Sequence, residues 1–293
     1  MSWIEVAFEL EASKIEAGIN LLEEAGALAI SIYDAKDSPI FEPPPKSEPI
    51  LWPYSILVGL FNAEFPVHTL LDSVAAIFPT ASAKVRNVRD QNWVAICQAH
   101  FPATRFGNLW ICPSWANKPT DPSSLCLNLD PGMAFGTGSH ATTALCLQWI
   151  SQTHFQTKKV LDYGCGSGIL ALACALSGAL RVWGVDYDAQ ALASSKTNQA
   201  NNKIPETQLS FHEPEDTTVQ SIQVDILIAN ILVTPLVELK PTFSRLLKPY
   251  GTLVLSGILA NQQEIIESAY SDAFDFIEKT SKEDWICLVA QKK

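Results

Sequence analysis

The sequence predicts an α/β protein in which a doubly wound, mostly parallel sheet follows a smaller α+β domain. Residues 159–161 form a short apolar strand that enters a turn with three glycines, and strong helix formers follow at residues 169–176. A second apolar strand, residues 181–185, ends at Asp186. In roughly the first 90 residues, strand and helix patterns follow the order strand, helix, strand, twice over. These observations predict crossover units in the second part of the chain and a separate first domain.

The composition predicts a folded cytoplasmic protein with room for two domains. The chain has 293 residues, of which 47% are hydrophobic and 17% are charged, as in globular proteins. Its apolar runs fall short of the ~18 residues that span a bilayer, and its start lacks the basic region of a signal peptide. The seven cysteines show no C-x-x-C pair and no metal-ligand spacing, so we expect reduced thiols and no metal. The net charge of −11 disfavours a nucleic-acid substrate and suits a basic protein partner.

The first domain, residues 1–90, is expected to be ferredoxin-like. Ser13 and Glu16 have the spacing of a capping box at the start of its first helix, and Gly26 is placed to end that helix. The domain holds no chemical motif. The carboxylates of this domain more often form just a solvated face. The alternative is that they form a docking surface for a partner. The expected strands are residues 3–10, 28–33, 55–61 and 84–88, and the second helix is expected over residues 67–78.

Residues 91–122 are expected to be a partly ordered linker. Their tryptophans argue against a flexible tether, and their prolines argue against a long regular element. Within them, residues 109–112 are expected to be extended. The second domain then spans residues 123–293.

An extended run at residues 125–129 leads into a loop rich in glycine and hydroxyl side chains, just before a helix. The small residues of this loop let the backbone close over a ligand. Thr137, His140 and Thr143 could hydrogen-bond polar groups of that ligand, and Phe135 could cover an apolar or cationic part of it. His140 taken alone is more often an N-terminal helix residue than a catalytic base.

The pattern D-x-G-x-G-x-G, from Asp162 to Gly168, joins the strand and the helix of the first crossover unit. Glycine lets a ligand approach bare backbone, and the helix N-terminus offers unpaired N–H groups. The acid before the first glycine departs from the dinucleotide fingerprint. Asp186, 22 positions after Gly164, is expected beside this turn, where it could accept both ribose hydroxyls, while Asp188 caps the next helix. The alternative for the turn alone is a tight bend without a ligand.

The rest of the chain completes the sheet. An apolar strand, residues 224–229, is expected to be buried on both faces and to end at Asn230, where the ligand crevice of such sheets opens. The last two strands are joined without a helix, so the final strand is expected to return antiparallel. The other expected strands are residues 208–211, 251–256, 273–279 and 285–291, and the other expected helices are residues 142–150, 189–199, 236–247 and 262–270.

Three blocks carry a resemblance to a known family: L-D-P-G-M-A-F-G-T-G-S-H-A-T-T, D-Y-G-C-G-S-G-I-L and A-N-I-L-V-T-P-L. They resemble the PrmA family, the methyltransferases of ribosomal protein L-eleven of the large subunit. R-F-G-N-L-W-I-C-P-S-W at residues 105–115 and F-E-P at residues 41–43 fit as well, so the resemblance covers nearly the whole chain. It implies a seven-strand Rossmann-like methyltransferase domain behind a small α+β substrate-recognition domain. It also implies that amino groups of this ribosomal protein, lysine ε-amines and the N-terminal α-amine, are methylated.

The resemblance further implies the cofactor, S-adenosylmethionine, and the residues that bind it. Small departures from the family are Ala141, where many relatives have proline, and Val233 with Thr234. Residues 94–99 depart too, because they lack the acidic and aromatic residues expected after Trp93. The implied cofactor-binding residues are Thr143, Gly164, Asp186 and Asn230, with Phe135, Gly136, Thr137 and His140 in a lid loop and Asp162 and Gly166 in the glycine turn.

Methyl transfer from a sulfonium is an in-line displacement that needs a neutral amine on the S–CH3 axis, but no metal and no covalent intermediate. A dry pocket beside a cation disfavours the ammonium form of the amine. Asn230 can accept a hydrogen bond from the amine and orient it, so we expect it to be catalytic. The alternative for Asn230 is a strand-terminal turn residue. The aliphatic loop after it lacks an aromatic clamp and would tolerate mono- and dimethylated amines.

Three other functions stay open. A methyltransferase acting on RNA or a small molecule would be favoured by a basic groove or a catalytic aromatic after Asn230, and the sequence shows neither. A binding module could hold the cofactor without transferring methyl groups. A nicotinamide oxidoreductase is disfavoured, because the acid before the glycines has no role there. We expect a monomer without a direct nucleic-acid substrate and without membrane attachment.

Overall fold

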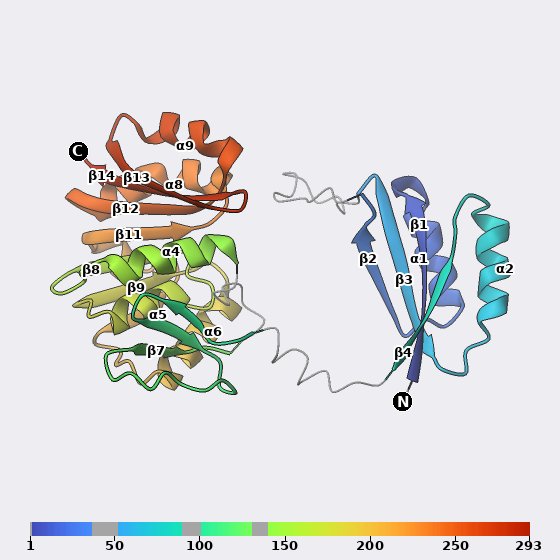
Figure 1. The fold of residues 1–293 in the computed structure, drawn as a ribbon. Coiled ribbons are helices and arrows are strands. Elements are labelled where there is room, and N and C mark those ends of the chain that lie inside the picture. Colours follow the sequence, from blue (N-terminus) through green and yellow to red (C-terminus); the bar gives the residue numbers. More distant parts are fainter. Residues whose placement is uncertain (1, 37–51, 90–100, 131–139) are drawn as a thin grey trace. The chain divides into compact units, whose positions relative to one another are not determined.

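The computed structural model describes residues 2–36, 52–89, 101–130 and 140–293. The chain divides into two compact units, Met1–Trp93 and Val94–Lys293 (Figure 1). Each unit has its own hydrophobic core. None of the helices in the described ranges is both long and apolar enough to cross a membrane.

The first unit is a four-stranded antiparallel sheet with two helices, which confirms the expected ferredoxin-like arrangement. Its strands lie in the order β2-β3-β1-β4. Val6 and Phe8, two positions apart on β1 and therefore on one face, are buried together with Leu22 and Leu70 of the two helices. Both helices thus pack on the same face of the sheet. The elements are β1 (Ser2–Glu11), α1 (Ile15–Glu24), β2 (Ala29–Asp34), β3 (Tyr54–Asn62), α2 (Val67–Ile77) and β4 (Lys84–Arg89).

The capping box expected at Ser13 is wrong. A short 3-10 turn, η1 (Ala12–Lys14), stands between β1 and α1, and the residue before α1 is Lys14, whose side chain makes no capping hydrogen bond. The first N–H of η1 donates to Pro53 O at 3.0 Å, so this turn is fixed by the segment that leads into β3 and not by a serine cap. Gly26 does confirm the expected helix end, with a left-handed φ of +84° just beyond α1.

Three short strands at the start of the second unit form a sheet of their own, β5-β6-β7. Phe106, Leu109 and Leu127 from these strands are buried in a core that they share with helices of the large sheet. Of the linker expected over residues 91–122, residues 91–100 lie outside the described residues, and β6 confirms the extended piece at residues 109–112. The described part differs from a linker in that its apolar side chains from residue 104 onward complete the core of the second unit. The strands are β5 (Thr104–Phe106), β6 (Leu109–Cys112) and β7 (Leu125–Asn128), with β5 antiparallel and β7 parallel to β6.

The large sheet of the second unit has the strand order β10-β9-β8-β11-β12-β14-β13. Neighbours from β10 to β12 are parallel, whereas β14 is antiparallel to β12 and β13, which confirms the expected antiparallel return. The strand order reverses at β8, between β9 and β11, and such a reversal opens a crevice at the carboxyl ends of these strands. The strands are β8 (Lys159–Tyr163), β9 (Arg181–Val185), β10 (Leu209–His212), β11 (Val224–Asn230), β12 (Leu247–Leu259), β13 (Phe274–Lys282) and β14 (Trp285–Lys292).

Helices cover both faces of this sheet (Figure 1). Three of them share a core cluster with Val160 of β8 and Ile228 of β11, and three others share a cluster with the next strand residues, Leu161 and Ala229. Successive strand residues point to opposite faces, so the two clusters lie on opposite sides of the sheet and confirm the predicted Rossmann-like fold. The first three helices are α4 (Ala141–Gln152), α5 (Ile169–Leu176) and α6 (Ala189–Asn201), and the others are α7 (Thr217–Ser221), α8 (Val233–Leu246) and α9 (Gln263–Tyr270).

Candidate functional site

The glycine turn between β8 and α5 has three residues in left-handed conformations. Gly164, Gly166 and Gly168 have φ values of +78°, +54° and +80°. The N–H of Gly164 donates to Val185 O, at the end of β9, over 2.7 Å. A Cβ added at Gly164 would lie 2.4 Å from Ile231 Cγ2, so a side chain there would collide with the loop after β11. The turn is therefore held between the carboxyl ends of β9 and β11.

Asp186, the residue after β9, places its carboxylate against this turn. Its Oδ2 accepts the N–H of Gly166 at 2.8 Å, and its Oδ1 accepts the N–H of Asp188 at 3.0 Å. The residue is only 8% exposed, yet each carboxylate oxygen keeps a second lone pair for another donor. Asp188 caps α6 by accepting the N–H of Gln190 at 2.8 Å, which confirms its expected role. Asp186 is thus an ordered acidic acceptor beside the glycine turn.

Asp162 lies fully buried on β8, beneath the same turn. Its Oδ2 accepts the N–H of Ala171 in α5 at 2.9 Å, and among the described residues its Oδ1 has no hydrogen-bond partner. Burial, with a smaller contribution from the charge of Asp186, raises the pKa of Asp162 to about 7, although the hydrogen bond from Ala171 lowers it. A buried acceptor without a donor suits a ligand that brings a donor or a positive charge.

A second group of predicted residues joins the end of β11 to the start of α4. Asn230 is the last residue of β11, and its Nδ2 donates to Thr143 Oγ1 at 3.3 Å. Thr143 lies almost fully buried in the first turn of α4. Because β11 pairs in parallel with β8, Asn230 and the glycine turn lie at the same edge of the sheet. This edge combines bare backbone, an acidic acceptor and a neutral amide, which can bind a ligand with hydroxyl groups and orient an amine.

His140 is the N-cap of α4. Its Nδ1 accepts the N–H of Thr142 at 3.4 Å and lies 2.8 Å from Thr142 Oγ1, and its ring meets Trp285 edge-to-face with centres 5.2 Å apart. This placement agrees with a helix N-terminal residue better than with a catalytic base. The lid residues Phe135, Gly136 and Thr137 lie outside the described residues, so their roles stay predictions.

Sequence reasoning missed two residues of α6 that support the glycine turn. Ser195 Oγ donates to Gly166 O at 2.7 Å, and Asn198 Nδ2 donates to Ser167 O at 2.9 Å. Their spacing of three residues indicates that they share one face of the helix. What this face contacts depends on how α6 packs beside α5, which no local pattern specifies.

The family model and the curated relatives match nearly the whole chain, and a solved structure matches about two thirds of it. The family model "Ribosomal protein L11 methyltransferase (PrmA)" matches residues 2–293. The chain is 42% identical over 297 residues to the ribosomal protein L11 methyltransferase of Shewanella pealeana, covering 100% of both chains. It is 41% identical over 298 residues to that of Vibrio cholerae, covering 100% of this chain and 99% of the relative. A crystal structure of ribosomal protein L11 methylase from Lactobacillus delbrueckii subsp. bulgaricus is similar with a TM-score of 0.59 and 29% identity, covering 66% of this chain and 100% of that chain.

Proposed function

The chain belongs to the ribosomal protein L11 methyltransferase family, PrmA, and on this premise we propose that it transfers methyl groups from S-adenosylmethionine to ribosomal protein L11. The proposed acceptors are lysine ε-amines and the N-terminal α-amine of that protein. One observation carries the proposal furthest. The glycine turn, Asp186 and Asn230 lie at the carboxyl ends of β8, β9 and β11, and Thr143 of α4 is hydrogen-bonded to Asn230.

The residues of this site fit S-adenosylmethionine. Asp186 has free lone pairs on both carboxylate oxygens, which suit the two hydroxyls of a ribose. Gly164, with its left-handed φ of +78°, lets the turn pass close to Ile231, whose side chain fills the space that a Cβ would take, and so shapes the turn beside Asp186. Asp162 Oδ1, without a partner among the described residues, suits a cofactor that carries positive charge.

Bound S-adenosylmethionine supplies a methyl group on a sulfonium, which an amine takes by in-line displacement. The protein has to orient the amine and favour its neutral form, because a lysine amine has a reference pKa of about 10.4. We assign the orienting role to Asn230, whose amide oxygen can accept from the amine while Nδ2 stays on Thr143 Oγ1. Ile231 and Leu232 follow it with aliphatic side chains, which supports tolerance of partly methylated amines.

Finer points of the proposal concern partner and compartment. The net charge of −11 supports a basic protein as substrate in preference to a nucleic acid. The cysteines in the described part of the chain are free thiols, which supports a reducing compartment such as the cytoplasm. We further propose that the protein acts as a monomer.

Intact-mass analysis of ribosomal protein L11 tests the proposed function. Incubation with the full chain and S-adenosylmethionine is expected to raise its mass in steps of one methyl group. Peptide mapping should place the methyl groups on lysine and N-terminal amines. An unchanged mass under conditions where the enzyme binds the cofactor would contradict the protein substrate, and methylation of RNA in a parallel incubation would favour the alternative.

Removing the first unit is expected to separate substrate recruitment from cofactor binding. All described residues of the site lie in the second unit, Val94–Lys293. This fragment should bind S-adenosylmethionine as the full chain does, but methylate ribosomal protein L11 at least about tenfold more slowly, because the tethered docking unit raises the local substrate concentration. The fragment must include β5 and β6, since Phe106 and Leu109 are core residues. Methylation at the full rate by a folded fragment would show that the first unit does not recruit the substrate.

Cofactor affinity is expected to rise with pH through the titration of Asp162. The pKa of its carboxyl is raised to about 7 in the free protein, and a bound cation favours the carboxylate, so binding releases a proton. Between pH 6 and pH 8 the affinity should increase about tenfold, and Asp162→Asn should remove this dependence. Calorimetry at pH 6 in two buffers of different ionisation enthalpy measures the released proton.

A rise in pH has the opposite effect on stability: the ionisation of Asp162 that strengthens cofactor binding makes the free protein less stable. Its folded pKa lies above the unfolded reference of about 3.9, so its contribution to stability is present below pH ~4 and is lost as the pH rises to about 7. Asp162→Asn should therefore raise the melting temperature at pH 8 more than at pH 4. Cofactor binding that releases no proton at pH 6 would contradict the predicted titration of Asp162.

A further inference from the structure

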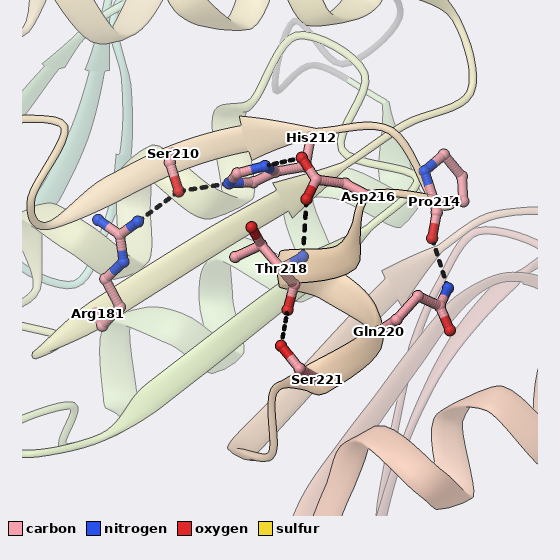
Figure 2. Close-up of polar contacts among 8 residues, drawn as sticks. All are labelled: Arg181, Ser210, His212, Pro214, Asp216, Thr218, Gln220 and Ser221. Atoms are coloured by element: carbon pink, nitrogen blue, oxygen red, sulfur yellow. Dashed lines mark hydrogen bonds and ion pairs between the residues drawn. The ribbon is translucent and has the colours of Figure 1, made fainter.

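Four polar side chains along β10 form a continuous series of hydrogen bonds, and we call them the edge network (Figure 2). Arg181, the first residue of β9, has one guanidinium nitrogen 2.6 Å from Ser210 Oγ. Ser210 Oγ lies 2.8 Å from His212 Nε2, and His212 Nδ1 lies 2.8 Å from Asp216 Oδ2. Asp216 is also the N-cap of α7, since its Oδ1 accepts the N–H of Thr218 at 2.7 Å. The edge network thus runs from the start of β9 to the segment after β10.

The two ends of the edge network set the direction of its hydrogen bonds. The guanidinium of Arg181 only donates, and the carboxylate of Asp216 only accepts. Hydrogen bonds from His212 and Thr218 lower the pKa of Asp216 to about 2, so this acceptor is ionised at neutral pH. Ser210 therefore accepts from Arg181 and, when His212 is neutral, donates to His212 Nε2. A neutral His212 then carries its proton on Nδ1, facing Asp216.

The order serine, histidine, aspartate resembles a hydrolytic triad, but the geometry excludes that activity. Ser210 is only 5% exposed, so a substrate carbonyl has no access to its hydroxyl. Arg181 also donates directly to the oxygen that would have to attack. The edge network therefore has a structural role at this place in the sheet.

β10 is the outermost strand of the large sheet and has a strand neighbour, β9, on one side. A strand at an edge is held by a single ladder of main-chain hydrogen bonds, so its end is free to move unless other contacts fix it. At this end, the carbonyl oxygen of His212 accepts the N–H of Asp186 at 3.2 Å. The side chain of His212 thus belongs to the edge network, and its main-chain oxygen is hydrogen-bonded to Asp186, the acid assigned to the ribose hydroxyls.

We propose that His212, fixed between Ser210 and Asp216, is a positioning residue that holds Asp186 in the conformation that binds the cofactor. The inference rests on the proposed function and deepens it, because it names what fixes the ribose acceptor. A loosened imidazole lets the last residue of β10 move, and the peptide N–H of Asp186 then loses its fixed acceptor. The effect falls on cofactor binding and not on the orientation of the amine, since Asn230, which orients the amine, lies on a different strand, β11.

Two substitutions at Asp216 break the edge network while keeping the cap of α7. Asp216→Asn and Asp216→Ser both retain a side-chain oxygen for the N–H of Thr218, and asparagine and serine are good N-caps. Neither can accept from His212 with a carboxylate oxygen. Ser221→Ala is the matched control, because Ser221 Oγ donates to Thr218 O within the same helix and lies outside the edge network.

The full-length variants are compared by calorimetry with S-adenosylmethionine, by steady-state kinetics and by ¹⁵N NMR of the histidine rings. Both Asp216 variants are expected to raise the Kd and the KM for the cofactor about three- to tenfold, with kcat at saturation nearly unchanged. The NMR signals of His212 should shift from the Nδ1–H toward the Nε2–H tautomer. Ser221→Ala should change neither the Kd and KM for the cofactor nor the tautomer of His212.

Melting curves identify a variant that fails to fold. If one Asp216 variant does not fold, the Kd of the other one tests the inference. An unchanged Kd in a folded variant whose His212 tautomer has shifted would overturn the inference. An equal loss of affinity in Ser221→Ala would overturn it too, because the effect would then come from α7 in general. Absence of cofactor binding by the unaltered protein would instead overturn the proposed function itself.

Discussion

Asn230→Ala is expected to lower single-turnover methyl transfer about a hundredfold or more at saturating cofactor, the scale of losing one well-placed polar group from an active site. Asn230 ends β11 at the crevice, and its Nδ2 is held by Thr143 Oγ1 at 3.3 Å. This contact fixes the plane of the amide, so its oxygen has a defined direction for the amine. Orientation of this kind acts mainly in the transition state, and its loss therefore appears in turnover more than in substrate binding.

The stability of the fold provides the control for Asn230. Its side chain is half-buried at a strand end, so Asn230→Ala should change the melting temperature little. Ser256→Ala is a useful comparison, because Ser256 is the register partner of Asn230 on β12 and is fully buried. Its hydroxyl contacts the main-chain oxygens of Thr142 and Ile286, so we expect it to affect stability more than turnover. Near-normal transfer by Asn230→Ala, or simple unfolding, would return Asn230 to the role of a turn residue.

Local signals in the sequence predicted where several residues of the candidate site lie. The glycines of residues 164–168 need left-handed φ angles that other residues rarely adopt, and the structure has all three in that region. Asp186 and Asn230 follow apolar strands, and parallel strands place their carboxyl ends at one edge of a sheet. The capping of α6 by Asp188 is likewise a short-range hydrogen bond. The left-handed glycines and the cap of α6 depend on residues close together in the sequence, whereas the common edge of Asp186 and Asn230 follows from the general rule for parallel strands.

Features that depend on distant residues were not predictable in the same way. The 3-10 turn before α1 is fixed by Pro53, about forty residues away, which outweighs the local capping signal at Ser13. The pairing of β6 with β7 is parallel and spans a long connection, so residues 104–112 look like a linker until the core they complete is known. The edge network requires the register of β9 against β10, which sets Trp183 opposite Ser210.

Asp186→Ala is expected to weaken S-adenosylmethionine binding about ten- to a hundredfold, since hydrogen bonds to a charged acceptor contribute ~1.5–3 kcal/mol. The carboxylate already accepts the N–H groups of Gly166 and Asp188, which orient it, and its remaining lone pairs are assigned to the ribose hydroxyls. Asp186→Asn should lose less affinity than Asp186→Ala, because the amide keeps one acceptor oxygen. Calorimetry with the full chain measures the affinity of each variant.

The neighbouring acid makes the test of Asp186 specific. Asp188→Asn removes one negative charge two residues away but keeps the N-cap of α6, because asparagine accepts the N–H of Gln190 as aspartate does. If the ribose contact determines binding, Asp188→Asn should leave the affinity within about twofold, since an exposed charge is screened by solvent. If the two variants lost affinity equally, the general negative field of this loop would explain binding. An unchanged affinity for S-adenosylmethionine in a folded Asp186→Ala protein would remove Asp186 from the site. The proposal that His212 positions a ribose acceptor would then fail as well.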